Sequence, residues 1–226
     1  MTEQEWLGCA DPRRMLEALD KREGTEGSAR SDAIPLLPPL WRAASTRLFR
    51  LGLAAAFRLD WDALTPQTRA AVEVMEGWAD GAVTYARVTE AKRVLWSLVY
   101  PRSPEHGDGR DPERDAARTL RDALDGRPHF FELVRSTRTP QRMPAIVRDI
   151  FGNPFRPVRV RPDWLTTTAV GLARTIYEDR AFDRLPILAD ALEDAGCDVP
   201  ALLDHCRGDG PHVRGCWVVD LVLRKE

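Results

Sequence analysis

The stretch "FDRLPILADALEDAG", residues 182–196, decides the fold class. Its leucines at positions 185, 188 and 192 recur at intervals of three and four residues, which is the period of one face of an α-helix. Asp183 is the expected N-cap, Pro186 lies in the expected first turn, and Gly196 is the expected stop. The stretch therefore predicts an amphipathic helix that buries its leucine face.

The same helical spacing recurs on both sides of this stretch. Asp11 with Pro12, and Thr65 with Pro66, are typical of helix starts. A half-buried β-strand needs alternating apolar and polar residues. The longest such alternation in the chain is "VRVR", residues 158–161, which lies within a proline-rich stretch over 151–164. We therefore predict an all-α, multi-helix globular domain with long loops, an extended proline-rich strap and at most one short hairpin. The other predicted helices cover residues 11–22, 40–59, 65–81, 83–100, 116–124 and 166–177, with short helical turns at 129–135 and 144–151.

The clearest break in the helical pattern is "PRSPEHGDGRDP", residues 101–112. It combines prolines and glycines with charges, which is typical of a loop or linker. We therefore divide the chain into an N-terminal helical region over 1–100, a linker over 101–112 and a C-terminal helical region over 113–226, packed together as one unit. The loops 23–31 and 103–110 are expected to be mobile because neither buries apolar surface.

Composition limits the classes of function. The chain has 226 residues, 43% of them hydrophobic, which is enough to bury a core. A net charge of −2 gives no general attraction to nucleic acid or to an anionic membrane surface. No apolar run reaches the roughly 18 residues of a membrane helix, and the N-terminus lacks the layout of a signal peptide. We expect a cytoplasmic protein with no membrane or nucleic-acid partner, whose four cysteines are reduced thiols or metal ligands.

Several stretches together resemble an uncharacterised helical protein family that is numerous in planctomycete genomes. They are "RLFRLGLAAAF", "RAAVEVMEGWADG", "RDIFGNPFRPV", "AFDRLPILADALEDAGC" and "HCRGDGPHVRGCWVVDLVLRKE", and the last three match closely. The resemblance implies a helical domain that is expanded in one lineage and has no established activity. Related sequences carry several cysteines after "RLF", where this chain has Leu53, Ala54, Ala55 and Ala56. If those cysteines formed a metal site with the C-terminal ones, this chain has lost half of it.

Residues 195–220, "AGCDVPALLDHCRGDGPHVRGCWVVD", concentrate the chemistry-bearing side chains of the chain. Structural zinc needs four nitrogen or sulfur ligands, often in pairs two to four residues apart. Adjacent His205 and Cys206 point about 100° apart on a helix, so they would not both bind one ion. The candidate zinc ligands are Cys197, Cys206, His212 and Cys216.

Packing is the alternative that we favour for these cysteines. Cys206 shares an apolar helical face with Leu202 and Leu203, where an inert thiol is expected. On this interpretation His205 and His212 bond backbone carbonyls around the "RGDGP" turn. A catalytic thiolate at Cys216 is a further alternative, but no signature of a cysteine hydrolase surrounds it.

Three arginines in the strap form a second candidate site. With Phe155 and Trp164 as stacking surfaces, they would bind single-stranded nucleic acid. The simpler interpretation is that alternating arginine and valine places arginine in water and valine against the core. We favour this interpretation because the net charge is close to zero. The three arginines are Arg156, Arg159 and Arg161.

The absence of a complete catalytic constellation decides the functional prediction. We predict a cytoplasmic helical protein-interaction or scaffold module without catalytic activity, which has a protein partner and no cofactor. The alternative is a zinc-binding or nucleic-acid-binding module that uses the C-terminal cysteines and histidines or the strap arginines.

Overall fold

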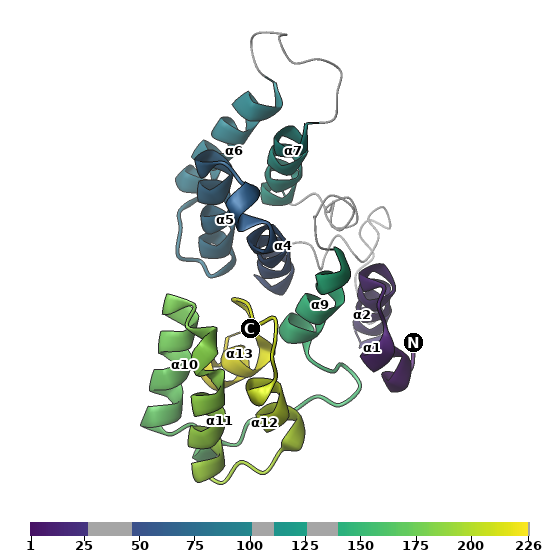
Figure 1. The fold of residues 1–226 in the computed structure, drawn as a ribbon, viewed down its shortest axis with the longest axis vertical. Helices are drawn as coiled ribbons and strands as arrows, with labels where there is room; N and C mark the ends of the chain where they lie inside the picture. The colour runs from purple at the N-terminus through teal and green to yellow at the C-terminus, as the bar shows by residue number, and fades with distance from the viewer. Residues whose placement is uncertain (27–46, 101–110, 126–139, 226) are drawn as a thin grey trace. The chain divides into compact units, whose positions relative to one another are not determined.

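The structure, a computed structural model, describes residues 1–26, 47–100, 111–125 and 140–225 (Figure 1). Every regular element in these ranges is a helix and none is a strand, which confirms the all-α prediction. No helix in these ranges is long and apolar enough to cross a bilayer. Residues 23–26 continue a helix, contrary to the predicted loop over 23–31. The remainder of that loop, the loop 103–110 and the predicted turn 129–135 lie outside the described residues.

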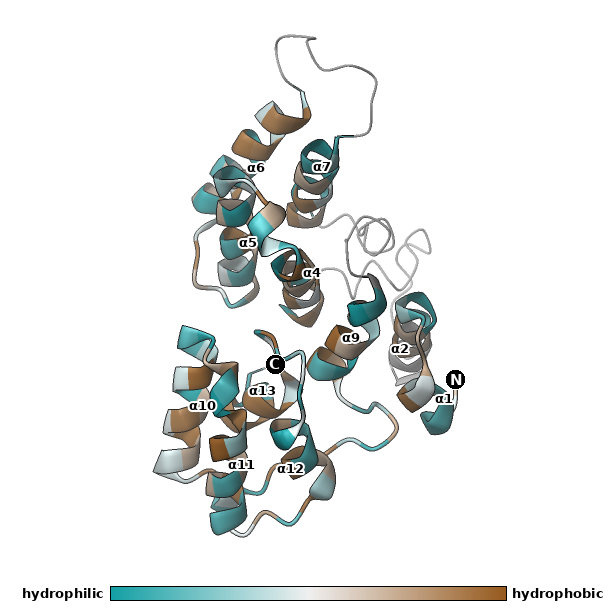
Figure 2. Cartoon of the chain, viewed as in Figure 1, coloured by the Kyte–Doolittle hydropathy of each residue, from teal (hydrophilic) through white to brown (hydrophobic). Residues whose placement is uncertain are grey.

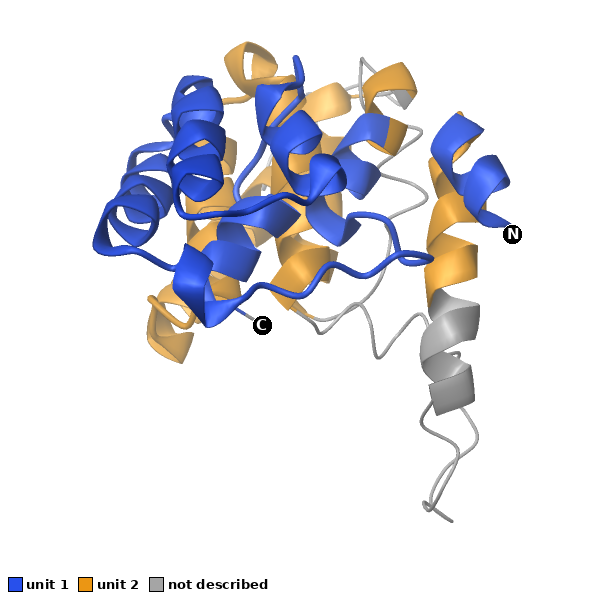
Figure 3. Cartoon of the chain, turned by 90° about the horizontal axis from the view of Figure 1, so that it is seen from below, with its two compact units in different colours: residues 1–8, 145–226 blue, residues 9–144 orange. Residues whose placement is uncertain are grey.

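The chain divides into two compact units (Figure 3). Unit 1 combines residues 1–8 with residues 145–226, and unit 2 consists of residues 9–144. The boundaries thus fall after residues 8 and 144, whereas the sequence analysis places the break at 101–112. The first eight residues of the chain therefore belong to the same unit as its last 82 residues, 145–226.

Unit 2 is built from helices that follow one another in the chain and pack against their neighbours. Helix α4 packs against α5, and α5, α6 and α7 pack against one another. The predicted N-caps are confirmed: the Asp11 side chain accepts the Arg13 amide at 2.9 Å, and the Thr65 hydroxyl accepts the Thr68 amide at 3.4 Å. The elements of this unit are α2 (Pro12–Glu26), α4 (Arg47–Leu59), η1 (Trp61–Ala63), α5 (Pro66–Ala79), α6 (Tyr85–Val99), α7 (Pro112–Leu124) and η2 (Pro140–Arg142).

Unit 1 has a core formed by its last four helices. Helix α11 (Leu185–Asp194) packs against α10 (Thr167–Asp179) and α12 (Pro200–Arg207), and α10 packs against α13 (Trp217–Leu223). The three leucines of α11 that the sequence analysis places on one face are fully buried, which confirms the predicted orientation. Hydrophobic and hydrophilic residues share these helices, as amphipathic packing requires (Figure 2).

The start of α11 differs from the prediction. Residues Phe182–Arg184 form a 3₁₀ turn, η4, that leads directly into α11. The N-cap is Arg184, and it makes no side-chain capping hydrogen bond. Asp183 lies inside the turn rather than at the extended position from which a cap accepts amide hydrogens, so its predicted role is wrong. Gly196 has a φ of +85° after the C-cap residue Ala195, as predicted for the stop.

The remaining elements of unit 1 lie at the N-terminus of the chain and on either side of the strap. They are α1 (Glu3–Gly8), α9 (Met143–Phe151, whose first two residues fall in unit 2) and η3 (Pro162–Trp164). The Arg148 side chain donates to the Trp6 carbonyl at 2.9 Å, and Glu3 binds Asn153 at 2.8 Å. Trp6 is fully buried. Residues 152–161 contain no strand, so the hairpin considered in the sequence analysis is not formed there. The strap is not extended throughout, because residues 154–156 form a turn in which the Arg156 amide donates to the Asn153 carbonyl at 3.2 Å.

Candidate functional site

Three segments of unit 1 bring four metal-binding side chains together. One comes from α9, one from α12 and two from the turn that leads into α13. One ligand atom from each side chain lies within 4.8 Å of all the others. We call this group the Asp149 cluster; its members are Asp149, His205, His212 and Cys216.

Asp149 is the centre of the hydrogen bonding in this cluster. Its side chain is 2% exposed. Oδ1 lies 3.1 Å from Nε2 of His205 and 2.8 Å from Nδ1 of His212, while Oδ2 accepts the Val213 amide at 2.9 Å. Burial alone would raise the pKa of Asp149, but the hydrogen bonds and charge of the two histidines lower it below its ordinary value. The carboxylate is therefore ionised although it is buried.

His212 is fixed through both ring nitrogens. Its Nε2 lies 3.2 Å from the Gly208 carbonyl oxygen, which confirms the predicted backbone contact in the "RGDGP" turn. Burial would lower the pKa of His212, but the hydrogen bond to Asp149 raises it above its ordinary value. His205 does not follow the same prediction, because its Nε2 points at Cys216 and Asp149 instead of at a carbonyl.

Cys216 completes the cluster as a fully buried thiol. Its Sγ lies 3.2 Å from Nε2 of His205. Burial raises the pKa of Cys216 well above its ordinary value, and the charge of Asp149 raises it further. Cys216 is therefore a protonated thiol and a weak nucleophile.

The cluster does not have the geometry of a catalytic triad. In a triad the base binds the nucleophile through one ring nitrogen and the orienting carboxylate through the other. Here a single nitrogen, Nε2 of His205, faces both the thiol and the carboxylate. The sequence-based alternative of a catalytic Cys216 therefore gains no support from its histidine neighbour.

The sequence-based ligand set overlaps with the Asp149 cluster in two residues. His212 and Cys216 belong to both sets. Cys197 and Cys206 lie in the hydrophobic core of unit 1, where Cys206 is fully buried as its apolar-face position predicts. Burial, followed by the charges of Asp149 and Cys197, raises the pKa of Cys206 to about 12. Asp149 was not among the residues predicted from the sequence, although a carboxylate that follows Arg148, between Val147 and Ile150 in an otherwise apolar helix, is a usable signal.

The strap arginines are exposed, and valines 158 and 160 pack against the core of unit 1, as the alternation predicts. Trp164 is only 3% exposed, and its Nε1 donates to the Gly196 carbonyl at 3.2 Å. A base cannot stack on a buried indole, so the predicted role of Trp164 in nucleic-acid binding is wrong. The three strap arginines are Arg156, Arg159 and Arg161.

A second candidate site lies in unit 2, on one face of α6 and the adjoining part of α7. Tyr85, Trp96 and Tyr100 are 66%, 55% and 51% exposed. The rings of Trp96 and Tyr100 have centroids 4.5 Å apart, and the Arg121 guanidinium lies 5.1 Å from the Trp96 ring. We call this region the α6–α7 surface; it comprises Tyr85, Thr89, Lys92, Arg93, Trp96, Tyr100, Arg121 and Asp125.

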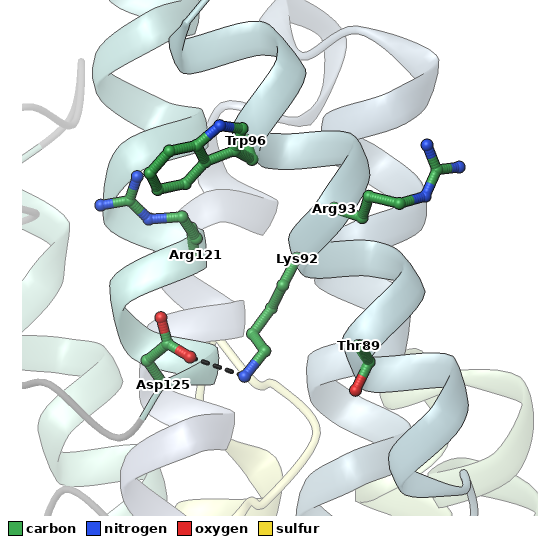
Figure 4. Close-up of a pocket in the computed structure, with 6 residues that line it drawn as sticks. All are labelled: Thr89, Lys92, Arg93, Trp96, Arg121 and Asp125. Atoms are coloured by element: carbon green, nitrogen blue, oxygen red, sulfur yellow. Dashed lines mark hydrogen bonds and ion pairs between the residues drawn. The ribbon is translucent and has the colours of Figure 1, made fainter.

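A shallow hollow of about 340 Å³ opens on this surface (Figure 4). Lys92 crosses it to form an ion pair with Asp125 at 2.6 Å. Arg93 extends away from that pair, as Figure 4 shows, and binds Glu90 at 2.6 Å. The hollow is lined by Thr89, Lys92, Arg93, Trp96, Arg121 and Asp125.

No family model, no curated protein and no solved structure matches this chain. The resemblance to a planctomycete family therefore stays a prediction from the sequence.

Proposed function

We propose that this chain is a helical protein-binding module without catalytic activity, and that it binds its partner through the α6–α7 surface. The observation that carries this proposal is a concentration of exposed aromatic residues. Among the described residues, six large hydrophobic side chains are exposed, and three of them lie on α6 or at its C-cap. Clustered exposed apolar residues are typical of interaction sites, and tryptophan, tyrosine and arginine dominate binding hot spots.

The aromatic residues are held in place before a partner arrives. Arg121 lies 5.1 Å from the Trp96 ring and 5.9 Å from the Tyr100 ring, and its side chain is mostly buried. The Lys92 ammonium lies 5.8 Å from the ring of Tyr85. Because these contacts already restrict the rings, binding would cost little additional side-chain entropy.

One exposed cation beside the hollow favours an acidic partner. Three cationic side chains and one carboxylate line the hollow, and two of the cations, Lys92 and Arg121, are held by Asp125 and Asp122. Arg93 is 72% exposed, and its pair with Glu90 is an exposed helical pair that contributes little to stability. Arg93 is therefore free to exchange Glu90 for a carboxylate of the partner. We infer that the partner is a protein segment with an apolar side chain next to acidic residues.

Two further observations support the other parts of the proposal. In the Asp149 cluster one nitrogen of His205 faces both the thiol and the carboxylate, which is not the arrangement of a catalytic triad and so favours a function without catalysis. The four cysteines are free thiols, which favours the cytoplasm, where thiols stay reduced.

Selection of binding peptides from a displayed random library, with the full chain as target, tests this function. We expect the selected peptides to be acidic and to lose affinity about ten-fold or more for Trp96→Ala, as expected of a hot spot. Ile187→Ala is the matched control, because Ile187 is 53% exposed on a helix of unit 1. Peptides without acidic residues, binding that survives Trp96→Ala, or no selected peptide at all would contradict the proposal.

A further inference from the structure

The Asp149 cluster in unit 1 brings four potential metal-ligand atoms close together. Tetrahedral zinc with bonds of 2.0–2.3 Å separates neighbouring nitrogen, oxygen and sulfur ligands by about 3.3 to 3.6 Å. In the cluster, Oδ1 of Asp149 is 3.1 Å from Nε2 of His205, which is 3.2 Å from Sγ of Cys216. All four ligand atoms are within 4.8 Å of one another. To give the separations of a zinc site, the two short distances would widen by a few tenths of an ångström, and separations near 4.8 Å would contract by about 1 Å.

The orientation of His205 points to a shared centre. Its Nε2 faces a sulfur and a carboxylate oxygen at nearly equal distances. One N–H hydrogen cannot be directed well at two acceptors on different segments, whereas one metal ion binds all three atoms at once.

His212 gives independent support through its second nitrogen. Its Nε2 lies beside the Gly208 carbonyl, which only an N–H group can bond. Its Nδ1 faces Oδ1 of Asp149 at 2.8 Å, with a shared proton or a metal ion between the two atoms. A histidine that binds a metal commonly donates its other N–H to a backbone carbonyl, as His212 does.

The charges of the cluster match a divalent cation. Once Cys216 gives up its thiol proton to bind a metal, its thiolate and the Asp149 carboxylate would together carry a charge of −2, and both side chains are almost fully buried. Buried charges need compensation, and a divalent ion bound between the two groups would provide it. The second oxygen of Asp149 is already held by the Val213 amide, so Oδ1 remains for the ion.

We propose that the Asp149 cluster binds one Zn²⁺ ion in a closed, structural site. Two imidazoles, one carboxylate and one thiolate are ligands that suit zinc, and four protein ligands leave no position for a substrate. On binding, Cys216 forms a Zn–S bond and releases its thiol proton to water. The ion then joins α9, α12 and the turn before α13, so the stability of unit 1 depends on it. This site is separate from the α6–α7 surface and does not rest on the proposed function.

Metal analysis of the untagged full chain, purified without chelator, tests the proposal. We expect one zinc per chain, and a melting temperature that falls when a strong chelator removes it. Cys216→Ser should lose the zinc, and chelator should not lower its melting temperature further. Cys206→Ala is the matched control, because Cys206 is an equally buried thiol next to His205 in the sequence, and this variant should keep its zinc.

Cobalt substitution keeps the test decisive if Cys216→Ser fails to fold. The wild-type chain, freed of metal and loaded with Co²⁺, should show the visible bands of tetrahedral cobalt and a thiolate-to-cobalt charge-transfer band. A wild-type chain that holds neither zinc nor cobalt would overturn the proposal. Loss of zinc from Cys206→Ala or Cys197→Ala, with retention in His205→Ala, would overturn this ligand set in favour of the one predicted from the sequence.

Discussion

Replacing Gly152 with alanine tests whether the packing of the strap supports the Asp149 cluster. Gly152 has a φ of +61°, a conformation that costs any other L-residue roughly 1 to 2 kcal/mol. An added Cβ would lie 3.2 Å from Cγ and 3.3 Å from Cδ2 of Trp217, closer than ordinary contact. Overpacking of this kind adds roughly 1 to 3 kcal/mol. We therefore expect Gly152→Ala to lower the free energy of unfolding by about 2 to 5 kcal/mol.

Gly196→Ala is the control that separates these two effects. Gly196 has a φ of +85°, but an added Cβ would have no atom within 4 Å, so only the conformational cost of about 1 to 2 kcal/mol applies. The difference between the variants, measured by urea unfolding with circular dichroism, reports the Trp217 contact. Because the Trp217 ring lies 5.2 Å from the His205 ring, Gly152→Ala should also lose metal more readily. Equal losses of stability in both variants would refute this reasoning.

Two other predictions concern burial in unit 1. Leu188→Ala should lower the free energy of unfolding by about 2 to 5 kcal/mol, because Leu188 is fully buried in α11. Its neighbour Ile187 is 53% exposed, so Ile187→Ala should change stability by no more than about 0.5 kcal/mol, and similar urea midpoints for both variants would contradict the helix orientation. Iodoacetamide should label the partly exposed thiol of Cys9 in the native chain and leave Cys206 unmodified, because burial raises the pKa of Cys206 to about 12. Mass spectrometry of the peptides identifies which cysteine is labelled. Early labelling of Cys206 would contradict the prediction, because it would show that this face of its helix is accessible to solvent.

The helices could be predicted because their signals are local. The leucine spacing of residues 185–192, and the caps Asp11 and Thr65, each depend on a few neighbouring residues, and the structure has them as predicted. The Asp183 cap could not be predicted correctly, because whether a 3₁₀ turn precedes the helix depends on packing that the local pattern does not contain. The division into units also depends on contacts between distant segments, such as that between Arg148 and Trp6.

Only those residues of the candidate site that lie close together in the sequence could be predicted. His212 and Cys216 stand out through their spacing, whereas Asp149 lies 63 residues before His212 and joins them only through the fold. The cluster contains His205 and not the adjacent Cys206, and neighbouring side chains on a helix point about 100° apart. Cys206 stood in the candidate ligand set predicted from the sequence, although its position on the apolar face also predicted packing. The positions of the two residues around the helix give the opposite assignment. Cys206 lies on the apolar face and packs, whereas its neighbour His205 faces the turn before α13.

X-ray absorption at the zinc edge of the purified chain tests the central claim most directly, because it counts the atoms bound to the metal. The Asp149 cluster predicts one sulfur at about 2.3 Å and three nitrogen or oxygen atoms at about 2.0 to 2.1 Å. The same spectrum of Cys206→Ala should be unchanged. Three sulfurs, as Cys197, Cys206 and Cys216 would supply, or a shell of oxygen atoms without sulfur would contradict the claim.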